Sequence, residues 1–337
     1  MNVNIECLNE YVQKVGTTVN YWMIRTMGGD YYDAFVDNGY IAIGYNDIPL
    51  QRIAELPQDH RIAVRQLKGY IAEHHQLIEN SGHVASQLYR FCSLLGEGDI
   101  VVLPGRSSFR MAVCRVTGPV YEEEENPQGV CPFRKRIPVT VLRRTSRLSL
   151  SPKAQLMFNS RHPVSDISSY AHYIDNTLHD FYDKGDELHL VLKVNTPNDV
   201  STSQFFAMER FIDLARMYCE ENGVEVGNDD IVMKVQMESP GVIHYITKNK
   251  KLLCILAFGI LFVNGGGLKI DTEGFKLDLS TPGLFDNISE FMDRRTDREM
   301  RVSMKAALDS LQIETPEDFQ KAVIGLYNAQ NEGRVDY

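Results

Sequence analysis

The chain has 337 residues, of which 43% are hydrophobic and 24% charged, and its 35 Lys and Arg against 45 Asp and Glu leave a net charge of −10. This composition excludes a disordered chain, and the length exceeds one ordinary core, so two domains are expected. Residues 1–150 carry 16 basic and 16 acidic side chains, whereas residues 151–337 carry 19 and 29. Because nucleic-acid affinity depends largely on positive charge, any nucleic acid is expected at the first half.

The six cysteines are scattered and none forms a CxxC pair. Residues 1–10 contain two glutamates and no apolar stretch of the kind found in a signal peptide. A cytoplasmic protein is the expectation.

In chain order, residues 4–14 have helical spacing, and the segment from Asn20 to Asp47 then sets the pattern for the first domain. It predicts a strand over 21–24, a turn, a short helix and a second strand over 40–43, with Asn38-Gly39 as the turn between them. The segment holds the only tryptophan, Trp22, and six of the 31 Tyr and Phe residues. Such aromatic density indicates either a small β core or a slot that stacks a planar ligand.

Residues 59–77 and 83–95 have apolar side chains at helical spacing. The next stretch alternates apolar and polar residues, which is typical of half-buried strands. It predicts strands over 99–103, 109–116 and 133–142, the first of them broken by Pro104-Gly105. Residues 20–145 are therefore predicted to form about five short strands with inserted helices, a small closed or nearly closed barrel.

Several segments in this range carry a resemblance to EVE-like domains of the PUA superfamily. They are, in order, Tyr21-Trp22-Met23-Ile24-Arg25, Gly39 to Tyr45, Gly98-Asp99-Ile100-Val101-Val102, Ala112 to Tyr121, Arg136-Ile137-Pro138-Val139 and Leu148-Ser149-Leu150. Their order and spacing resemble the variant found at the N-terminus of bacterial modification-dependent restriction proteins. Thr140-Val141 stands where that family has a strand tryptophan. The resemblance covers residues 20 to about 160.

The resemblance implies a pocket for a flipped, often modified, base that stacks on aromatic rings. An aromatic ring contributes about 1–3 kcal/mol per stacked base, enough to offset extrusion from a duplex. The candidate base- or nucleotide-binding residues are Tyr21, Trp22, Arg25, Tyr31, Tyr32, Tyr45, Pro104, Arg106 and Arg110. Strand alternation places Tyr21 and Trp22 on opposite faces, so only one of them faces the barrel interior.

The basic residues have alternative roles. Arg25 is expected either to hold a phosphate or base edge, or to pair with Asp30 or Asp33. Arg106 and Arg110 flank a loop and are expected to contact phosphate. A further basic band consists of Arg134, Lys135, Arg136, Arg143, Arg144 and Arg147, which either binds nucleic acid or pairs with the acidic run 122–125.

The second half has a different pattern. Residues 161–186 are predicted to form a linker helix, and residues 187–337 an acidic α+β domain. In that domain strands are expected over 188–194, 231–237 and 242–246, and helices over 203–221, 284–292, 298–311 and 316–329. The fold class is thus α+β, with an EVE-like domain over 1–160, the linker, and a second domain that oligomerises or acts as an effector.

The apolar run 252–263 is shorter than the roughly 20 residues that span a bilayer. It predicts a buried helix or strand, or a face hidden in an oligomer, and a membrane-active element is the less favoured alternative. Residues 265–267 are expected to form a turn. His172, Asp175 and His179 share a helical face, which favours a solvated surface over a metal site.

The sequence contains no recognised catalytic motif. Asp229, Asp230 and Lys234 come nearest to a metal-dependent nuclease, but their spacing is wrong. No cofactor and no metal are therefore expected. The favoured hypothesis is a bacterial defence sensor whose first domain, through residues 20–145, binds modified nucleic acid, DNA in preference to RNA, or a nucleotide. Residues 187–337 would then form a homo-oligomer or recruit a protein partner. The alternatives are a modification-specific nuclease with an unrecognised catalytic domain, and a non-catalytic assembly protein.

Overall fold

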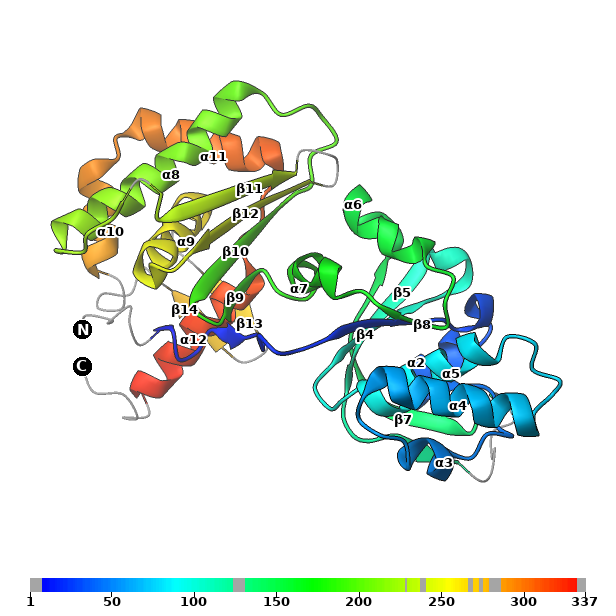
Figure 1. Ribbon diagram of the computed structural model, residues 1–337. Helices are drawn as coiled ribbons and strands as arrows, with labels where there is room; N and C mark the ends of the chain where they lie inside the picture. The colour runs from blue at the N-terminus through cyan, green and yellow to red at the C-terminus, as the bar shows by residue number, and fades with distance from the viewer. Residues whose placement is uncertain are drawn as a thin grey trace. The chain divides into compact units, whose positions relative to one another are not determined.

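The computed structural model describes residues 8–123, 131–227, 229–236, 241–265, 269–272, 275–278 and 286–331 (Figure 1). The fold is α+β, as the sequence predicts. The chain divides into two compact units. The half-barrel unit comprises Thr18–Leu178, and the helix-covered unit comprises Met1–Thr17 together with His179–Tyr337.

The half-barrel unit is built on one curled sheet with the strand order β3-β7-β5-β4-β2-β8, and β6 pairs with β7. Its strands are β2 (Tyr21–Ile24), β3 (Tyr40–Ile43), β4 (Ile100–Pro104), β5 (Arg110–Val116), β6 (Tyr121–Glu122), β7 (Lys135–Ser146) and β8 (Val164–Asp166). Strands β2 and β4 are parallel, and the other pairs are antiparallel. Among the described strands no pairing joins β3 to β8, so the curled sheet forms a half-barrel.

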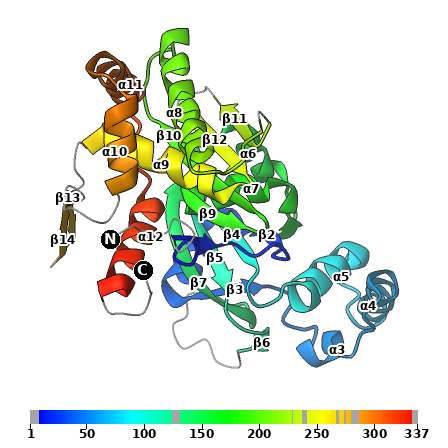
Figure 2. The ribbon, with the colours of Figure 1, turned by 90° about the vertical axis from the view of Figure 1, so that its left-hand side faces the viewer.

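Helices lie between these strands in the chain, and one follows the last strand. They are α2 (Tyr32–Asn38), α3 (Leu50–Ala54), α4 (His60–His74), α5 (Ser81–Tyr89), α6 (Pro152–Gln155) and α7 (Ala171–Leu178). Figure 2 shows α3, α4 and α5 as one group beside the strands of this unit. The predicted turn at Asn38-Gly39 is confirmed, because Gly39 ends α2 in the left-handed conformation with a φ of 68°.

Two cores flank the sheet of the half-barrel unit. Strand β2 contributes Trp22 and Ile24 to one core and Tyr21 and Met23 to the other. This division follows from the alternation of side chains along a strand. The expectation that Tyr21 and Trp22 lie on opposite faces is confirmed.

The boundary between the units differs from the predicted linker helix over 161–186. Residues in this range form β8, α7 and then β9 (Phe181–Lys184), and the division between the units falls after Leu178. Sequence periodicity missed these breaks because β8 is only three residues long. At the N-terminus, Gln13–Lys14 form strand β1, parallel to β9, in place of the end of the helix predicted over 4–14, and residues 4–7 of that range lie outside the described residues. This pairing places the first residues in the helix-covered unit.

The helix-covered unit contains a five-stranded sheet with the order β1-β9-β10-β12-β11. Its other strands are β10 (Glu187–Val194), β11 (Ile231–Gln236) and β12 (Gly241–Thr247), and β13 (Lys269–Thr272) pairs with β14 (Phe275–Asp278). Its helices are α8 (Thr202–Glu221), α9 (Lys250–Gly265), α10 (Asp286–Arg295), α11 (Arg298–Leu311) and α12 (Glu317–Asn331). These elements match the predicted ones closely. The turn predicted at 265–267 lies largely outside the described residues.

Helix α9 forms the centre of this unit, and it accounts for the apolar run 252–263. Every side chain from Leu252 to Leu261, apart from Gly259, contributes to the core or is fully covered. Helices α8, α10, α11 and α12 add further side chains to this core, to which Leu190 and Tyr245 of the sheet also belong. The run is therefore a buried helix. None of the described helices combines the length and apolarity needed to cross a bilayer.

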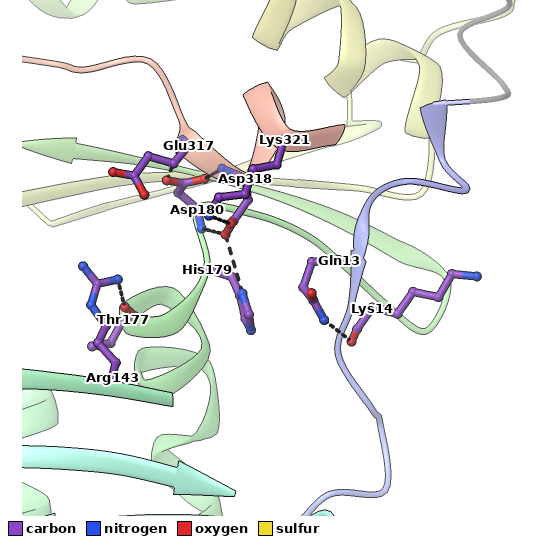
Figure 3. Close-up of polar contacts among 9 residues, drawn as sticks. All are labelled: Gln13, Lys14, Arg143, Thr177, His179, Asp180, Glu317, Asp318 and Lys321. Atoms are coloured by element: carbon purple, nitrogen blue, oxygen red, sulfur yellow. Dashed lines mark hydrogen bonds and ion pairs between the residues drawn. The ribbon is translucent and has the colours of Figure 1, made fainter. Parts of the chain in front are cut away.

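Two aspartates fasten the start of α12 to β9 (Figure 3). The carboxylate of Asp180 accepts the backbone N–H groups of Glu317 and Asp318, both at 2.9 Å. The carboxylate of Asp318 in turn accepts the N–H of Asp180 at 3.1 Å and lies 3.0 Å from the ammonium of Lys321 and 3.5 Å from Nδ1 of His179. Burial opposes ionisation of Asp318, but the bonds from His179, Lys321 and Asp180 outweigh it and hold its pKa at about 2.

We expect Asp318→Asn to destabilise the helix-covered unit by about 2–3 kcal/mol at pH 7, since one unit of pKa shift corresponds to about 1.4 kcal/mol. The folded-state pKa of Asp318 lies below its unfolded value. Its contribution is therefore complete above the unfolded pKa of roughly 4 and is lost as the pH falls toward about 2. Burial raises the pKa of Asp180, so the contribution of this carboxyl group to stability changes with pH in the opposite direction. Denaturant unfolding followed by circular dichroism at pH 7, 5 and 3 measures the difference between the variant and wild type.

That difference should narrow as the pH falls. The matched control is Glu314→Gln, which removes an exposed carboxylate near the start of α12. A gap between Asp318→Asn and wild type that stayed constant from pH 7 to pH 3 would contradict the expectation.

Candidate nucleic-acid interface

Trp22, the residue on which the predicted base slot depends, is a core residue. Its side chain is 5% exposed and packs in the larger core of the half-barrel unit. Its indole Nε1–H donates to Oδ2 of Asp99 at 2.9 Å. The ring is thus enclosed and its polar atom is satisfied, which removes Trp22 from the accessible surface. The aromatic segment was expected to form either a small β core or a slot for a planar ligand, and Trp22 belongs to a core.

Tyr21 is also enclosed. Its ring lies in the second core, and its hydroxyl donates to Asp175 at 2.5 Å. Burial and the carboxylate of Asp175 together raise the pKa of Tyr21 well above its usual range. Asp175 therefore has a structural role in α7, where the sequence suggested a solvated face shared with His172 and His179.

The remaining predicted tyrosines differ in exposure. Tyr32 is buried, Tyr31 is half-buried, and Tyr45 is 37% exposed. The ring of Tyr31 lies edge-on to Phe133 with 5.0 Å between the ring centroids. Tyr45 has a positive φ of 63°. Tyr31 and Tyr45 thus remain available for contact, and Tyr32 does not present a free face.

Of the two roles expected for Arg25, pairing with Asp30 or Asp33 is absent from the contacts of the described residues. Its guanidinium donates to the backbone carbonyls of Phe158 and Ser160, including a 3.2 Å bond from Nε to Ser160. Burial, with a smaller effect from the like charge of Arg147, lowers the pKa of Arg25. Neither Asp30 nor Asp33 is its partner in these bonds. Arg25 holds the chain after α6 against the end of β2.

Two residues of the basic band are enclosed in the fold. Lys135 and Arg136, at the start of β7, are buried. Nζ of Lys135 donates to the carbonyl of Tyr45 at 2.8 Å, and burial lowers its pKa. Arg136 lies 4.3 Å from the centroid of the Tyr40 ring and 3.5 Å from Glu123. This part of the band is structural and includes a pair with the acidic run.

Arg106 and Arg110, in contrast, flank an exposed turn between β4 and β5, which we call the arginine turn (residues 106–110). Arg106, Phe109 and Arg110 all project into solvent, and Phe109 is 55% exposed. Among the described residues, no hydrogen bond or ion pair engages the guanidinium of Arg106. Pro104 precedes the turn, but it is buried, and its carbonyl accepts the hydroxyl of Thr26 at 2.5 Å.

Two exposed ion pairs lie beside the arginine turn. Arg110 is 3.3 Å from Asp33, and Arg144 is 2.9 Å from Asp37. The two aspartates are one helical turn apart on α2, and the guanidinium of Arg110 lies 5.0 Å from the centroid of the Tyr32 ring. Exposed pairs of this kind contribute about 0–1 kcal/mol, so a phosphate can displace the aspartates at small cost.

The conformation of the arginine turn is tightly constrained. Ser107 and Ser108 have φ values of 52° and 53°, in the left-handed region that costs non-glycine residues energy. The turn lies against Gly29, where an added Cβ would stand 2.3 Å from the backbone nitrogen of Arg106. The backbone N–H of Arg147 donates to the carbonyl of Phe109 at 2.8 Å. A strained, braced turn that presents exposed side chains is typical of a binding surface.

Phe109 is the residue that the sequence analysis missed. It was assigned to the strand over 109–116, whereas β5 begins at Arg110. The signal that could have found it is an aromatic residue between two arginines, the pattern of single-stranded nucleic-acid binding surfaces.

The ranges that the structure describes contain no group of three or more His, Cys, Asp or Glu side chains placed to hold a metal ion. Of the residues nearest to a nuclease pattern, Asp230 accepts the backbone N–H of Gly227 at 2.9 Å and so closes a turn.

Comparison with known proteins adds no assignment. No family model, no curated protein and no solved structure matches this chain.

Proposed function

We propose that the half-barrel unit binds nucleic acid at the arginine turn. An unpaired or extruded base would stack on Phe109, and Arg106 and Arg110 would hold the adjacent phosphates. The observation that carries this proposal is the exposure of an aromatic ring between two exposed arginines on a braced turn. The proposal keeps the extruded base that the EVE-like resemblance implies, and it moves the stacking ring from Trp22 to Phe109.

The energetics of this arrangement are favourable. Stacking on one ring contributes about 1–3 kcal/mol per base, which is comparable to the cost of extruding a base from a duplex. Arg106 has no competing partner among the described residues, and the pair between Arg110 and Asp33 is exposed. Phosphates therefore meet one free and one weakly held guanidinium. The acidic side chains of α2 repel phosphates, and they therefore limit any binding of a duplex that depends on charge alone.

We expect Phe109→Ala to weaken binding of single-stranded DNA by about 5- to 150-fold, the equivalent of 1–3 kcal/mol for one stacked base. Arg106→Ala should weaken it less and reduce the slope of log K against log salt by about 0.7. Fluorescence anisotropy with labelled oligonucleotides measures both effects. The matched controls are Leu77→Ala and Arg61→Ala, which remove an exposed apolar and an exposed basic side chain elsewhere in the unit.

Binding that depends on salt but not on Phe109 would reduce the site to a general charge contact and overturn the stacking role. Duplexes with modified cytosine or adenine, measured beside unmodified duplexes, test modified-base recognition. Tighter binding of the modified duplex supports the sensor hypothesis, and equal binding removes it.

The proposal includes a cytoplasmic location. A reducing cytoplasm favours free thiols, such as those of Cys92, Cys114, Cys131, Cys219 and Cys254.

A further inference from the structure

The two edges of the sheet in the helix-covered unit are very different. Strand β1 at one edge has only two residues, both exposed, and one is Lys14. Strand β11 at the other edge has six residues, and among the described strands it pairs only with β12. Short strands and lysines are the usual means by which proteins protect a sheet edge against pairing with another chain. Strand β1 has both protections, and β11 has only Lys234.

The exposed side chains of β11 are apolar as well as polar. Val232 is 50% exposed and Met233 is 37% exposed. Ile231 and Val235 pack against the core on one face of the sheet, so Met233 lies on that face too. Val232 and Lys234 lie on the opposite face, together with Asp230 just before the strand. Because β11 leaves one row of backbone N–H and C=O groups without a partner strand, it offers a template for an added strand.

We propose that two copies of this chain associate by antiparallel pairing of their β11 strands, so that the two sheets continue into one. A two-fold axis that keeps each face of the sheet continuous requires some residue of β11 to lie opposite the same residue of the second copy. Only a few registers meet this condition, and the charges select among them.

The register centred on Val232 places the charged side chains of the strand and of the residue before it opposite each other. Asp230 then lies opposite Lys234 of the second copy, twice by symmetry, and Met233 lies opposite Ile231. Opposite charges across a strand pair are stabilising, and like charges are destabilising. The register centred on Lys234 places two lysines together, and the register centred on Met233 places Lys234 opposite Val232. The charge pattern of β11 therefore favours a second copy of the same strand over an unrelated peptide.

The test uses the full chain. Size-exclusion chromatography with light scattering is expected to show a dimer, and Val232→Cys is expected to form a disulfide-linked dimer under mild oxidation. Met233→Cys should not, because in this register it faces Ile231 and not itself. Wild type, whose described cysteines are buried or half-buried, is the control for background oxidation.

Charge reversal provides an independent readout. Lys234→Glu and Asp230→Lys should each convert the dimer to a monomer, and the double variant should restore the dimer. Restoration of the dimer by the double variant shows that the single variants act through strand pairing, because the double variant still lacks the hydrogen bond between Asp230 and Gly227. A monomeric wild type, a dimer that survives Lys234→Glu, or cross-linking through Met233→Cys in preference to Val232→Cys would overturn the proposal. These outcomes leave binding at the arginine turn untouched, since that site lies in the other unit.

Discussion

Asp99→Ala is expected to destabilise the half-barrel unit by about 3–5 kcal/mol, because it leaves several hydrogen-bond donors without their acceptor and each unsatisfied buried donor costs about 1–3 kcal/mol. The carboxylate of Asp99 accepts four hydrogen bonds and is 5% exposed. Oδ1 accepts the backbone N–H and the side-chain amide of Asn20, at 3.1 and 3.2 Å. Oδ2 accepts the indole of Trp22 at 2.9 Å and the N–H of Gly96 at 3.1 Å. Alanine leaves all four donors without this acceptor.

Denaturant unfolding followed by Trp22 fluorescence measures this loss, because the only tryptophan of the chain lies in the same core. Asp99→Asn, which keeps the shape and one acceptor oxygen, should lose about half as much. Glu97→Ala removes an exposed acidic side chain two residues away and should change the free energy of unfolding by less than about 0.5 kcal/mol. A loss below about 1 kcal/mol for Asp99→Ala would show that water replaces the carboxylate in this site.

The hydrogen bond between Trp22 and Asp99 also explains why the sequence alone did not show that Trp22 is enclosed in the core. A strand that begins with Tyr21-Trp22 predicts correctly which ring lies on which face. It does not tell whether the enclosed ring borders a cavity, because the atom that satisfies the indole is 77 residues further along the chain. The same limit applies to Tyr21, whose acceptor Asp175 lies 154 residues away. Local pattern determined the elements, and long-range contacts determined which aromatic rings are accessible.

Other parts of the fold also divide into those that local sequence patterns predict and those that depend on long-range contacts. The helices and strands of residues 187–337 follow from periodicity and capping residues, and the structure places them close to the predicted ranges. The strand formed by Gln13–Lys14 depends on parallel pairing with a distant strand, which no local pattern indicates. The arginine turn depends on positive φ values at Ser107 and Ser108. A serine in the sequence does not indicate a positive φ, whereas a glycine often does. The sequence therefore indicated the exposed residues Arg106 and Arg110 of the proposed site, but not Phe109.

We expect Gly29→Ala to lower the stability of the half-barrel unit by about 2–4 kcal/mol and to weaken nucleic-acid binding at least as much as Arg106→Ala does. Gly29 has a φ of 106°, which is unfavourable for alanine. Its added Cβ would stand 2.3 Å from the nitrogen and 2.4 Å from the Cα of Arg106. Because both of these Arg106 atoms belong to the backbone, the clash is relieved only when the arginine turn moves away. Unfolding by denaturant and anisotropy with labelled DNA measure the two effects.

The neighbouring glycine supplies the control. Gly28 has a φ of 72°, and an added Cβ would have no atom within 4 Å. Gly28→Ala should therefore cost only the backbone strain, about 1 kcal/mol, and should leave the arginine turn and its affinity for DNA unchanged. Equal effects of the two substitutions on affinity would contradict the bracing role of Gly29. If Gly29→Ala weakened binding while Phe109→Ala and Arg106→Ala did not, the contact with nucleic acid would lie on residues 27–29 and not on the arginine turn. The comparison thus separates the turn's position from the chemistry of its side chains, which is the distinction on which the proposed site depends.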